Sequence, residues 1–372
     1  MQSFSLYIHY PFCKKLCNYC DFYKKTISAG QSYEELEKGL QTHFNSVLSL
    51  IEEKGAPSLG SIDTLYLGGG TPSLWGEEGA EFLGKFLKTN GLEFSNGHEF
   101  TMEVDPGAWT ESGLRSWHKL GVNRYSIGLQ SLNSDFIEIM DRSHDVGESL
   151  KTLKYFKDAG CNYSVDLMLG LPYSVERKRK IREEIDMAMD YRPSHFSVYI
   201  LKTRKNYPHN DVLPYDTFTS EEYLEVSEIL KSYGFDHYEV SNFALPGKYS
   251  EHNQKYWRAQ TVHALGPNAT GFFMFSSNQA VRYQHRPSNT GYSKEELNES
   301  ELKLEQVYLG LRTNSGLDTR THFRSSQVTE IVKKWNGLGY VHKFESGQLV
   351  LSSKGYLMID SLMDDLFRFE LL

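Results

Sequence analysis

Three of the four cysteines in this sequence lie within eight positions, with the spacing Cys13-x3-Cys17-x2-Cys20. The fourth, Cys161, is isolated. In a reducing compartment, cysteines clustered at short spacing indicate metal binding or catalysis before disulfides. A structural zinc site usually takes four ligands in two pairs, so it would need a distant fourth ligand such as a histidine. An iron–sulfur cluster accepts thiolates from one loop, and a cubane of four irons held by three cysteines keeps one iron open for chemistry.

The composition limits the class of protein that carries this loop. The chain has 372 residues, 39% apolar and 24% charged, with a net charge of −8. These values predict a globular protein with one large domain plus a smaller one, and the acidic charge argues against nucleic-acid binding. We find no run of eighteen apolar residues and no secretory signal. We therefore expect a cytoplasmic protein without a membrane span.

Six short apolar segments alternate with amphipathic helical patterns in the first 245 residues. The segments are 5–9, 62–67, 99–104, 124–129, 163–169 and 195–200. Three helical stretches follow pairs with the spacing of a capping box, namely Ser32 and Glu35, Asp145 and Glu148, and Thr219 and Glu222. This alternation predicts an α/β fold around a parallel sheet, either doubly wound or curled into a barrel.

Polar or glycine-rich features follow the carboxyl ends of five of these segments. They are the cysteine loop, the stretch GGGTPS at 68–73, Glu103, Gln130, and Asp166 with the GLP stretch at 170–172. Chemistry in parallel sheets and barrels is located at the carboxyl ends of the strands. We therefore expect these features to form one site.

Each feature has a chemical role and a plainer alternative. Backbone N–H groups of the glycines could bind a carboxylate or an amino-acid backbone, although a tight turn also uses glycine. Glu103 could accept hydrogen bonds from a diol or an ammonium group, or form a salt bridge. Gln130 and Asp166 are polar groups at apolar strand ends and need partners, which a polar cofactor would supply. Arg142 could pair with a carboxylate, or be a solvated arginine at a helix end.

The cysteine spacing and its surroundings, LYIHYPFCKKLCNYCDF, resemble the radical S-adenosylmethionine (SAM) proteins, in the branch related to coproporphyrinogen oxidases. The resemblance runs from residue 4 to about residue 365. It implies a partial (β/α)6 barrel, a [4Fe–4S] cluster on Cys13, Cys17 and Cys20, and SAM at the open iron, where the family forms a 5′-deoxyadenosyl radical. By position it implies SAM contacts at Tyr7, Tyr19, Gly69, Gly70, Thr71, Glu103, Gln130, Arg142 and Asp166.

Two departures separate the chain from the oxygen-independent coproporphyrinogen III oxidases. Those enzymes carry a further cysteine two positions after the third, where this sequence has Phe22. They also carry a longer N-terminal extension, which we do not expect here because Tyr7 lies so near the start. In both respects the chain is similar to the HemW-type proteins, which are regarded as haem chaperones.

A second motif points the same way. HNQKYW, residues 252–257, is similar to the HNxxYW motif linked to haem binding in HemW-type proteins. A histidine can ligate haem iron and aromatic rings can cover a porphyrin face, so the resemblance implies haem contacts at His252, Tyr256 and Trp257. The plainer alternative is a buried histidine in an aromatic cluster. Thr270 stands where the family motif GxGAHGF has a histidine.

The C-terminal part has its own pattern. We expect a radical SAM core at 1–245, a connection with the haem motif at 246–299, and a third domain at 300–372, with 283–300 irregular. Helical patterns at 301–312, 325–336 and 353–367 flank two β-like stretches, which predicts a winged-helix-like α+β domain. Its nine basic and nine acidic residues favour a cover or a docking surface over DNA binding. The run ERKRKIREE at 176–184 is interpreted as a solvated helix face.

The leading hypothesis is a haem chaperone on a radical SAM scaffold, with a [4Fe–4S] cluster, SAM and haem. Its partners would be a haem-accepting protein and an electron donor such as flavodoxin or ferredoxin. The alternatives are a radical SAM enzyme acting on a porphyrin-like substrate, as an oxidative decarboxylase or methyltransferase, and a zinc-dependent structural protein. The sequence leaves open the acceptor and the oligomeric state, a homodimer included.

Overall fold

The core of the protein is a single twelve-stranded sheet. The computed structural model describes residues 2–28, 30, 32–287, 291–323 and 325–368. The strand order is β14-β13-β12-β11-β1-β4-β5-β6-β7-β8-β10-β9. Its six central strands are parallel and confirm the six expected strands: β1 (Gln2–Tyr10), β4 (Leu59–Gly69), β5 (Phe94–Val104), β6 (Arg124–Gln130), β7 (Tyr163–Leu169) and β8 (His195–Ile200).

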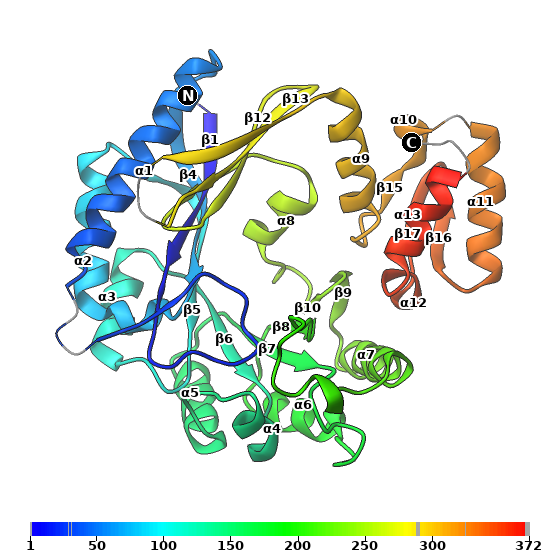
Figure 1. Ribbon diagram of the computed structural model, residues 1–372, viewed down its shortest axis with the longest axis horizontal. Coiled ribbons are helices and arrows are strands. Elements are labelled where there is room, and N and C mark those ends of the chain that lie inside the picture. Colours follow the sequence, from blue (N-terminus) through cyan, green and yellow to red (C-terminus); the bar gives the residue numbers. More distant parts are fainter. Residues whose placement is uncertain (1, 29, 31, 288–290, 324, 369–372) are drawn as a thin grey trace.

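The sheet curls into an open ring whose outer face is covered by helices (Figure 1). The fold is therefore the expected partial barrel rather than a doubly wound sheet. The outer helices are α1 (Glu34–Glu53), α2 (Gly76–Thr89), α3 (Glu111–Leu120), α4 (Ser134–Ile139), α5 (Val146–Asp158), α6 (Ile181–Met189) and α7 (Asp216–Ser232), with short 3-10 turns η1 (Pro72–Trp75) and η2 (Asn210–Val212). None of the described helices has the length and apolar character needed to cross a membrane.

Helix starts follow the expected capping pairs only in part. Asp145 and Glu148 form the predicted capping box of α5. The prediction for Thr219 and Glu222 was wrong, because α7 begins at Asp216 and Glu222 is buried. Helix α1 begins at Glu34, whose N–H donates to Ser32 Oγ over 3.2 Å.

Side chains of the central strands alternate between the two faces of the sheet. Apolar residues such as Met102, Ile127 and Val165 join the core that packs under the outer helices. Their neighbours in sequence are polar and hydrogen-bond one another across the strands, as Ser126 does with Asp166. This alternation directs polar side chains into the ring.

Further strands extend both edges of the sheet. β11 (Val262–Leu265) pairs parallel with β1, and β12 (Thr270–Ser276), β13 (Gln279–His285) and β14 (Tyr292–Leu297) follow antiparallel. On the other side, β10 (Asn242–Ala244) and β9 (Asp236–Glu239) add to β8.

The expectation that residues 283–300 are irregular was therefore wrong, apart from 288–290, which lie outside the described residues. β14 is an edge strand, and its charged residues lie exposed on the surface. The charged residues also make ion pairs at the end of α1, from Lys294 to Glu53 and from Glu296 to the C-cap residue Lys54. Four strands of segment 246–299, β11 to β14, thus belong to the main sheet.

One helix, α8 (Glu251–Trp257), lies inside the ring (Figure 1). Glu99 of β5 accepts hydrogen bonds from the backbone N–H groups of Glu251 and His252 at its first turn, each over 2.9 Å. A carboxylate at a helix N-terminus satisfies free N–H groups and interacts favourably with the helix dipole. Glu99 therefore anchors α8 to the inner face of the sheet.

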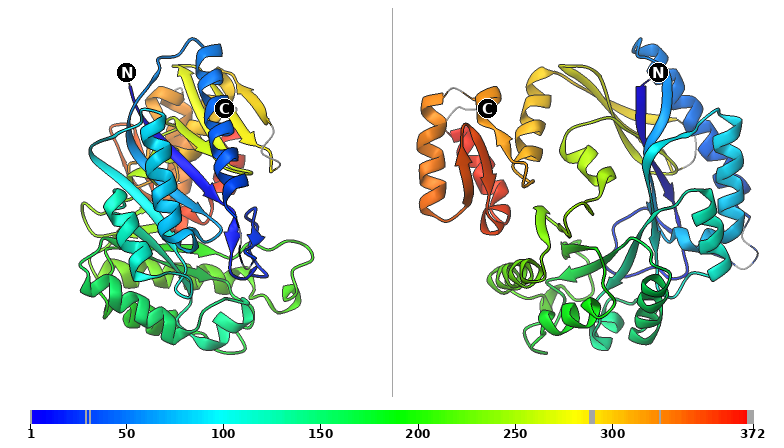
Figure 2. Two further views of the ribbon diagram at one scale, coloured as in Figure 1. Left: turned by 90° about the vertical axis from the view of Figure 1, so that its left-hand side faces the viewer. Right: turned by 180° about the vertical axis from the view of Figure 1, so that it is seen from behind.

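The C-terminal residues form a small α+β module next to α9 (Glu299–Gly310), seen from two further sides in Figure 2. Its sheet has the order β15-β17-β16. The two β-like stretches expected in this part form a hairpin that turns at Ser346 and Gly347, both with positive φ. The elements are β15 (Leu317–Asp318), α10 (Thr319–His322), α11 (Ser325–Gly337), β16 (Val341–Glu345), β17 (Gln348–Leu351), α12 (Ser353–Tyr356) and α13 (Ile359–Arg368).

Candidate functional site

A cavity of about 440 Å³ lies at the carboxyl ends of the parallel strands. The cysteine loop and the ends of β4 to β8 form its walls. All residues expected to bind the cluster or SAM line this cavity, with the exception of Tyr7. The lining residues are Cys13, Cys17, Tyr19, Cys20, Gly69, Gly70, Thr71, Glu103, Gln130, Arg142 and Asp166. The fold thus brings together features that lie far apart in the sequence, as the position of the strand ends predicts.

The three cysteines lie on a loop that is closed at its base. The short strands β2 (Phe12–Cys13) and β3 (Lys25–Thr26) pair in parallel there. Within the loop the N–H of Cys20 donates to the carbonyl of Cys17 over 3.4 Å. All three thiols are free and face the same cavity.

The surroundings of Cys13 and Cys17 favour neutral thiols until a metal binds. Burial raises the pKa of Cys13 to about 11, although the Thr71 hydroxyl beside it acts in the opposite direction. Burial also raises the pKa of Cys17, and the positive charge of Arg142 acts in the opposite direction. Arg142 Nη1 donates to Cys17 Sγ over 3.6 Å. A metal reverses this preference because it binds thiolates. No three His, Cys, Asp or Glu side chains in the described part of the chain converge on one metal ion, whereas each thiolate of a cubane binds a different iron.

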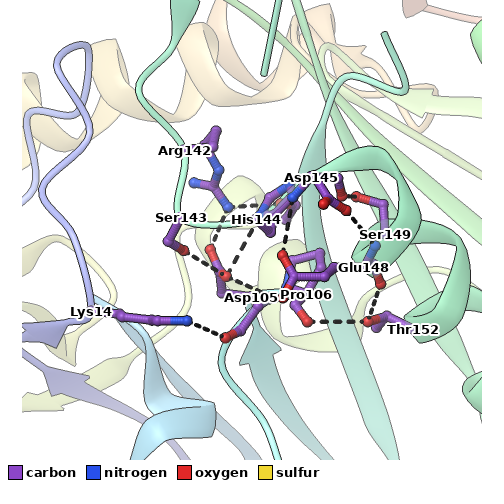
Figure 3. Close-up of polar contacts among 12 residues, drawn as sticks. Lys14, Asp105, Pro106, Arg142, Ser143, His144, Asp145, Glu148, Ser149 and Thr152 are labelled. Carbon is purple, nitrogen blue, oxygen red and sulfur yellow. Dashed lines mark hydrogen bonds and ion pairs between the residues drawn. The ribbon is translucent and has the colours of Figure 1, made fainter. Parts of the chain in front are cut away.

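Asp105 holds Arg142 beside the cysteine loop (Figure 3). Arg142 Nη2 donates to Asp105 Oδ2 over 2.6 Å and to the carbonyl of Gly128 over 2.8 Å. The Ser143 hydroxyl and the N–H of Gly107 donate to Oδ1. Burial alone would raise the pKa of Asp105, but Arg142 holds it well below its usual range. Arg142 is thus fixed by the protein, while its buried Nε has no hydrogen-bond partner among the described residues.

Glu103 projects from the end of β5 into the cavity. It accepts hydrogen bonds from the Tyr66 hydroxyl and from the N–H of Gly69, each over 3.0 Å. Burial raises its pKa to about 7, and the nearby Asp166 carboxylate adds to the effect. A carboxylate poised in this way is stabilised by an incoming cation, such as an ammonium group.

The expected role of the glycine segment needs a correction. The N–H of Gly69 is taken by Glu103, and those of Gly70 and Thr71 donate to carbonyl oxygens of the chain before the cysteine loop, over 2.6 and 2.8 Å. These N–H groups are therefore not available to a ligand. A Cβ on Gly69, which has φ +114°, would lie 2.5 Å from the ring of His9. Glycine is required there by close packing.

Gln130 and Asp166 complete the polar wall. Gln130 has a left-handed backbone (φ 65°), and its buried Oε1 has no hydrogen-bond partner among the described residues. Because buried amide oxygens are nearly always paired, this atom marks a position for a ligand donor. Asp166 accepts hydrogen bonds from the hydroxyls of Ser126 and Ser164 over 2.8 and 3.0 Å. Burial raises its pKa.

The aromatic residues of the site are placed differently from one another. Tyr19 packs against the cluster that contains Phe136, and its hydroxyl accepts from Arg142 over 3.1 Å. Tyr7 does not line the cavity. Its hydroxyl forms a hydrogen bond with His9 Nδ1 over 3.0 Å. Phe22, at the position of the missing cysteine, is 68% exposed and lines the cavity mouth.

The structure does not bring the three haem-motif residues into one cavity. His252 is 1% exposed and hydrogen-bonds Thr64 through Nδ1 over 2.8 Å. Its Nε2 is buried without a partner in the described structure, and the Tyr66 ring lies 5.3 Å away. Burial lowers the pKa of His252 to about 3, so the ring is neutral. A neutral imidazole can bind iron, but this one faces packed side chains.

The other two motif residues face separate spaces. Trp257 lines a polar cavity of about 320 Å³, between α8 and the C-terminal module. Tyr256 lines a different cavity of about 400 Å³, together with Thr270. Tyr256 and Trp257 therefore line two separate cavities rather than one shared space.

The sequence analysis missed several residues of the main site. Asp105, Tyr66, Ser126 and Tyr199 line the cavity but were not singled out. Asp105 follows Glu103 by two positions, so the period of a strand could have placed it on the same face. Tyr66 and Ser126 lie within otherwise apolar strands. The one sequence signal for them is that polar and apolar residues alternate along these strands, which directs every second side chain into the ring.

Comparisons with known proteins agree on the family and the fold. A model of the radical SAM superfamily matches residues 7–185. The radical S-adenosyl methionine domain-containing protein 1, mitochondrial, of Danio rerio is 30% identical, covering 96% of this chain and 86% of that protein. Heme chaperone HemW of Bacillus subtilis is 29% identical, and the match covers 95% of this chain and 96% of that protein. Heme chaperone HemW of Buchnera aphidicola is 30% identical, and the match covers 73% of this chain and 70% of that protein.

A solved structure shows the same architecture. Coproporphyrinogen III oxidase (HemN) from Escherichia coli, described as a radical SAM enzyme, superposes with a TM-score of 0.76. The match covers 97% of this chain and 89% of that one at 19% identity. At this identity the likeness shows the fold alone.

Proposed function

Since this chain belongs to the radical SAM superfamily, within its HemW-type group, we propose that it is a haem chaperone that carries haem to an acceptor protein. Relatives of similar length that are named haem chaperones support this proposal. The observation that carries the radical SAM part of the proposal is the strand-end cavity, where three free thiols face a polar wall with an unpaired amide oxygen.

We propose that Cys13, Cys17 and Cys20 hold a [4Fe–4S] cluster. The donor set fits, because the three thiols share one loop and one cavity. When bound, the cluster supplies an iron with an open position and an electron. Arg142, fixed beside Cys17, adds a positive charge that offsets the thiolates.

The remaining wall suits SAM. Glu103 and the unpaired Oε1 of Gln130 are acceptors for an ammonium or hydroxyl group, and Tyr19 offers an aromatic ring. Asp166 is held by serine hydroxyls, which orient its carboxylate. We assign Tyr7 an indirect role, through its contact with the ring of Tyr66 and thereby with Glu103.

The pH dependence of SAM binding tests the role of Glu103. Its pKa is raised to about 7 by burial, so the carboxylate is protonated below that pH and ionised above it. The dissociation constant for SAM is therefore expected to fall as pH rises from 6 to 7.5, a range in which an α-ammonium group stays largely charged. Calorimetric titration at several pH values should show this trend. In Glu103→Gln the constant should be weaker and insensitive to pH. An unchanged trend in that variant would exclude Glu103 as the group responsible.

The surface around the cysteine loop suits a protein partner. Leu16 and Phe22 are exposed beside the cavity, and Lys14, Lys15, Lys24 and Lys25 belong to the same segment. We propose that an acidic electron donor, such as flavodoxin or ferredoxin, docks here. The free thiols fit a reducing compartment such as the cytoplasm.

Haem titration and transfer test the proposed function. Ferric haem added to the purified protein should give a sharp Soret band at one equivalent. Apomyoglobin added afterwards should take up that haem faster than it takes haem from serum albumin. Absence of a saturable Soret change would contradict the chaperone proposal. Turnover of coproporphyrinogen under anaerobic, reducing conditions would show an enzyme instead.

A further inference from the structure

Behind Asp166, a row of buried polar side chains leads away from the strand-end cavity. Ser164 precedes it on β7, His195 begins the neighbouring strand β8, and Tyr238 lies on the edge strand β9. These three side chains do not line the cavity, and the residues are 0%, 1% and 2% exposed. They therefore act on a ligand only through Asp166, if they act on it at all.

Each side chain of this row hydrogen-bonds the next. Ser164 Oγ lies 3.0 Å from Asp166 Oδ1 and 2.8 Å from His195 Nδ1. The other ring nitrogen of His195, Nε2, lies 2.8 Å from the Tyr238 hydroxyl, whose oxygen also accepts the backbone N–H of Ser250 over 3.2 Å. Ser250 is the N-cap residue of α8. An unbroken row of hydrogen bonds thus joins the start of α8 to a carboxylate of the cavity wall.

The direction of these hydrogen bonds follows from the hydrogens available. Ser164 has one hydroxyl hydrogen, which it donates to Asp166, because an ionised carboxylate can only accept. Burial, together with the charge of Arg124, lowers the pKa of His195 well below its usual value, so the ring is neutral and carries one hydrogen. That hydrogen is on Nδ1, which donates to Ser164, and Nε2 accepts from Tyr238. Every donor in the row therefore points toward Asp166.

The opposite tautomer of the histidine would break this order. With its hydrogen on Nε2, His195 would take the Ser164 hydrogen at Nδ1, and Asp166 would lose a donor. The Tyr238 oxygen would then face two N–H groups, and its own hydrogen would have no acceptor in the row. Because buried polar groups are nearly always paired, Tyr238 and Ser250 select the Nδ1–H form.

We propose that His195 is a positioning residue for Asp166. As the Nδ1–H tautomer it directs the Ser164 hydroxyl to the carboxylate, which then presents its remaining lone pairs to hydroxyl or N–H groups of the ligand. The inference rests on the SAM site proposed above and adds a specificity to it. A carboxylate held ionised by the hydroxyls of Ser126 and Ser164 selects ligand groups that donate hydrogen bonds.

The tautomer can be observed directly and without a ligand. In nitrogen-15 NMR spectra of the full chain labelled at histidine, Nδ1 of His195 should have the chemical shift of a protonated ring nitrogen, and Nε2 that of an unprotonated one. The variant His195→Gln assigns these signals through their absence. A wild-type spectrum with the hydrogen on Nε2 would overturn the inference.

Calorimetric titration of the reconstituted protein with SAM measures the effect on the site. His195→Leu should weaken SAM binding by about tenfold, because nothing then directs the Ser164 hydroxyl to Asp166. His195→Gln should bind nearly as the wild type does, since its amide can donate to Ser164 and accept from Tyr238. The matched control is His237→Leu, which should keep the wild-type dissociation constant. His237 Nε2 also bonds a tyrosine hydroxyl, over 3.2 Å, but lies outside the row. Circular dichroism confirms that each variant is folded.

The outcomes separate this inference from the SAM site on which it rests. Tyr238→Phe removes only the donor to Nε2 and should weaken binding in the same direction as His195→Leu. An unchanged dissociation constant in both variants would overturn the inference. Equal losses in His195→Leu and His195→Gln would show a packing role and overturn it too. If the wild type binds no SAM, the proposed cofactor site fails, and the tautomer alone decides whether His195 orients Asp166.

Discussion

Replacing Cys17 by serine is expected to abolish assembly of the iron–sulfur cluster. A serine hydroxyl is a poor ligand for iron in a cubane, and the two remaining thiols leave two irons without a protein ligand. After anaerobic reconstitution with iron and sulfide, the wild type should hold about four irons per chain and absorb broadly in the visible range. Cys17→Ser should stay nearly colourless.

The fourth cysteine provides the matched control. Cys161 packs half-buried against the core and does not line the cavity. Cys161→Ser should therefore keep the full iron and sulfide content. Equal iron in Cys17→Ser and the wild type would contradict the three-cysteine cluster, and stoichiometric zinc with no colour would favour the structural zinc site.

Replacing Arg179 by methionine is expected to cost about 3–5 kcal/mol of the free energy of unfolding, which is typical when one partner of a buried ion pair is removed. Arg179 Nε donates to Glu184 over 2.8 Å, and Nη1 lies 3.3 Å from a Glu222 oxygen. These two carboxylates also accept from Ser131, Leu132 and Gly170, which follow β6 and β7. The network therefore holds the strand-end loops beside the cavity.

Urea unfolding followed by circular dichroism measures the loss. The control is Arg177→Met, whose ion pair with Asp135 is exposed and should change stability by no more than about 0.5 kcal/mol. A loss for Arg179→Met no larger than for this control would contradict the buried network.

The loss in free energy of unfolding caused by Arg179→Met should also depend on pH. Burial alone would raise the pKa of Glu184, but Arg179 outweighs burial and lowers it. A carboxyl with a lowered folded pKa stabilises the protein above its unfolded pKa, and that contribution is lost as pH falls. In the variant this carboxylate would be buried without its cation, so its pKa would rise. The stability difference should therefore begin to narrow as the pH falls through the raised pKa of this carboxyl in the variant, and it should narrow further below about 4.5, where the wild type loses its stabilisation.

Much of the barrel follows from local sequence patterns. All six parallel strands were predictable because each is a short apolar run between helical patterns. The convergence of Cys13, Glu103 and Asp166 was also predictable, since carboxyl ends of parallel strands meet at one edge. Capping at Asp145 follows from two residues three positions apart.

The residues whose roles were predicted wrongly or missed have contacts with residues far away in the sequence, which local patterns do not reveal. Arg179 stands in a run of exposed charges, and nothing local shows that it pairs with a buried glutamate on α7. Glu222 resembles a capping residue, yet it binds the loop after β7. The charged strand β14 lacks an apolar alternation because its outer face meets solvent. Similarly, HNQKYW does not reveal that His252 faces the sheet while Tyr256 faces a pocket.

The central claim is that the cysteine loop and the strand-end wall form one cofactor site. Electron paramagnetic resonance of the reconstituted, reduced protein, recorded with and without SAM, tests it most directly. The account predicts a [4Fe–4S] signal whose g-values shift on addition of SAM, and a smaller shift at equal SAM concentration in Glu103→Gln. A cluster signal that is identical with and without saturating SAM would contradict it.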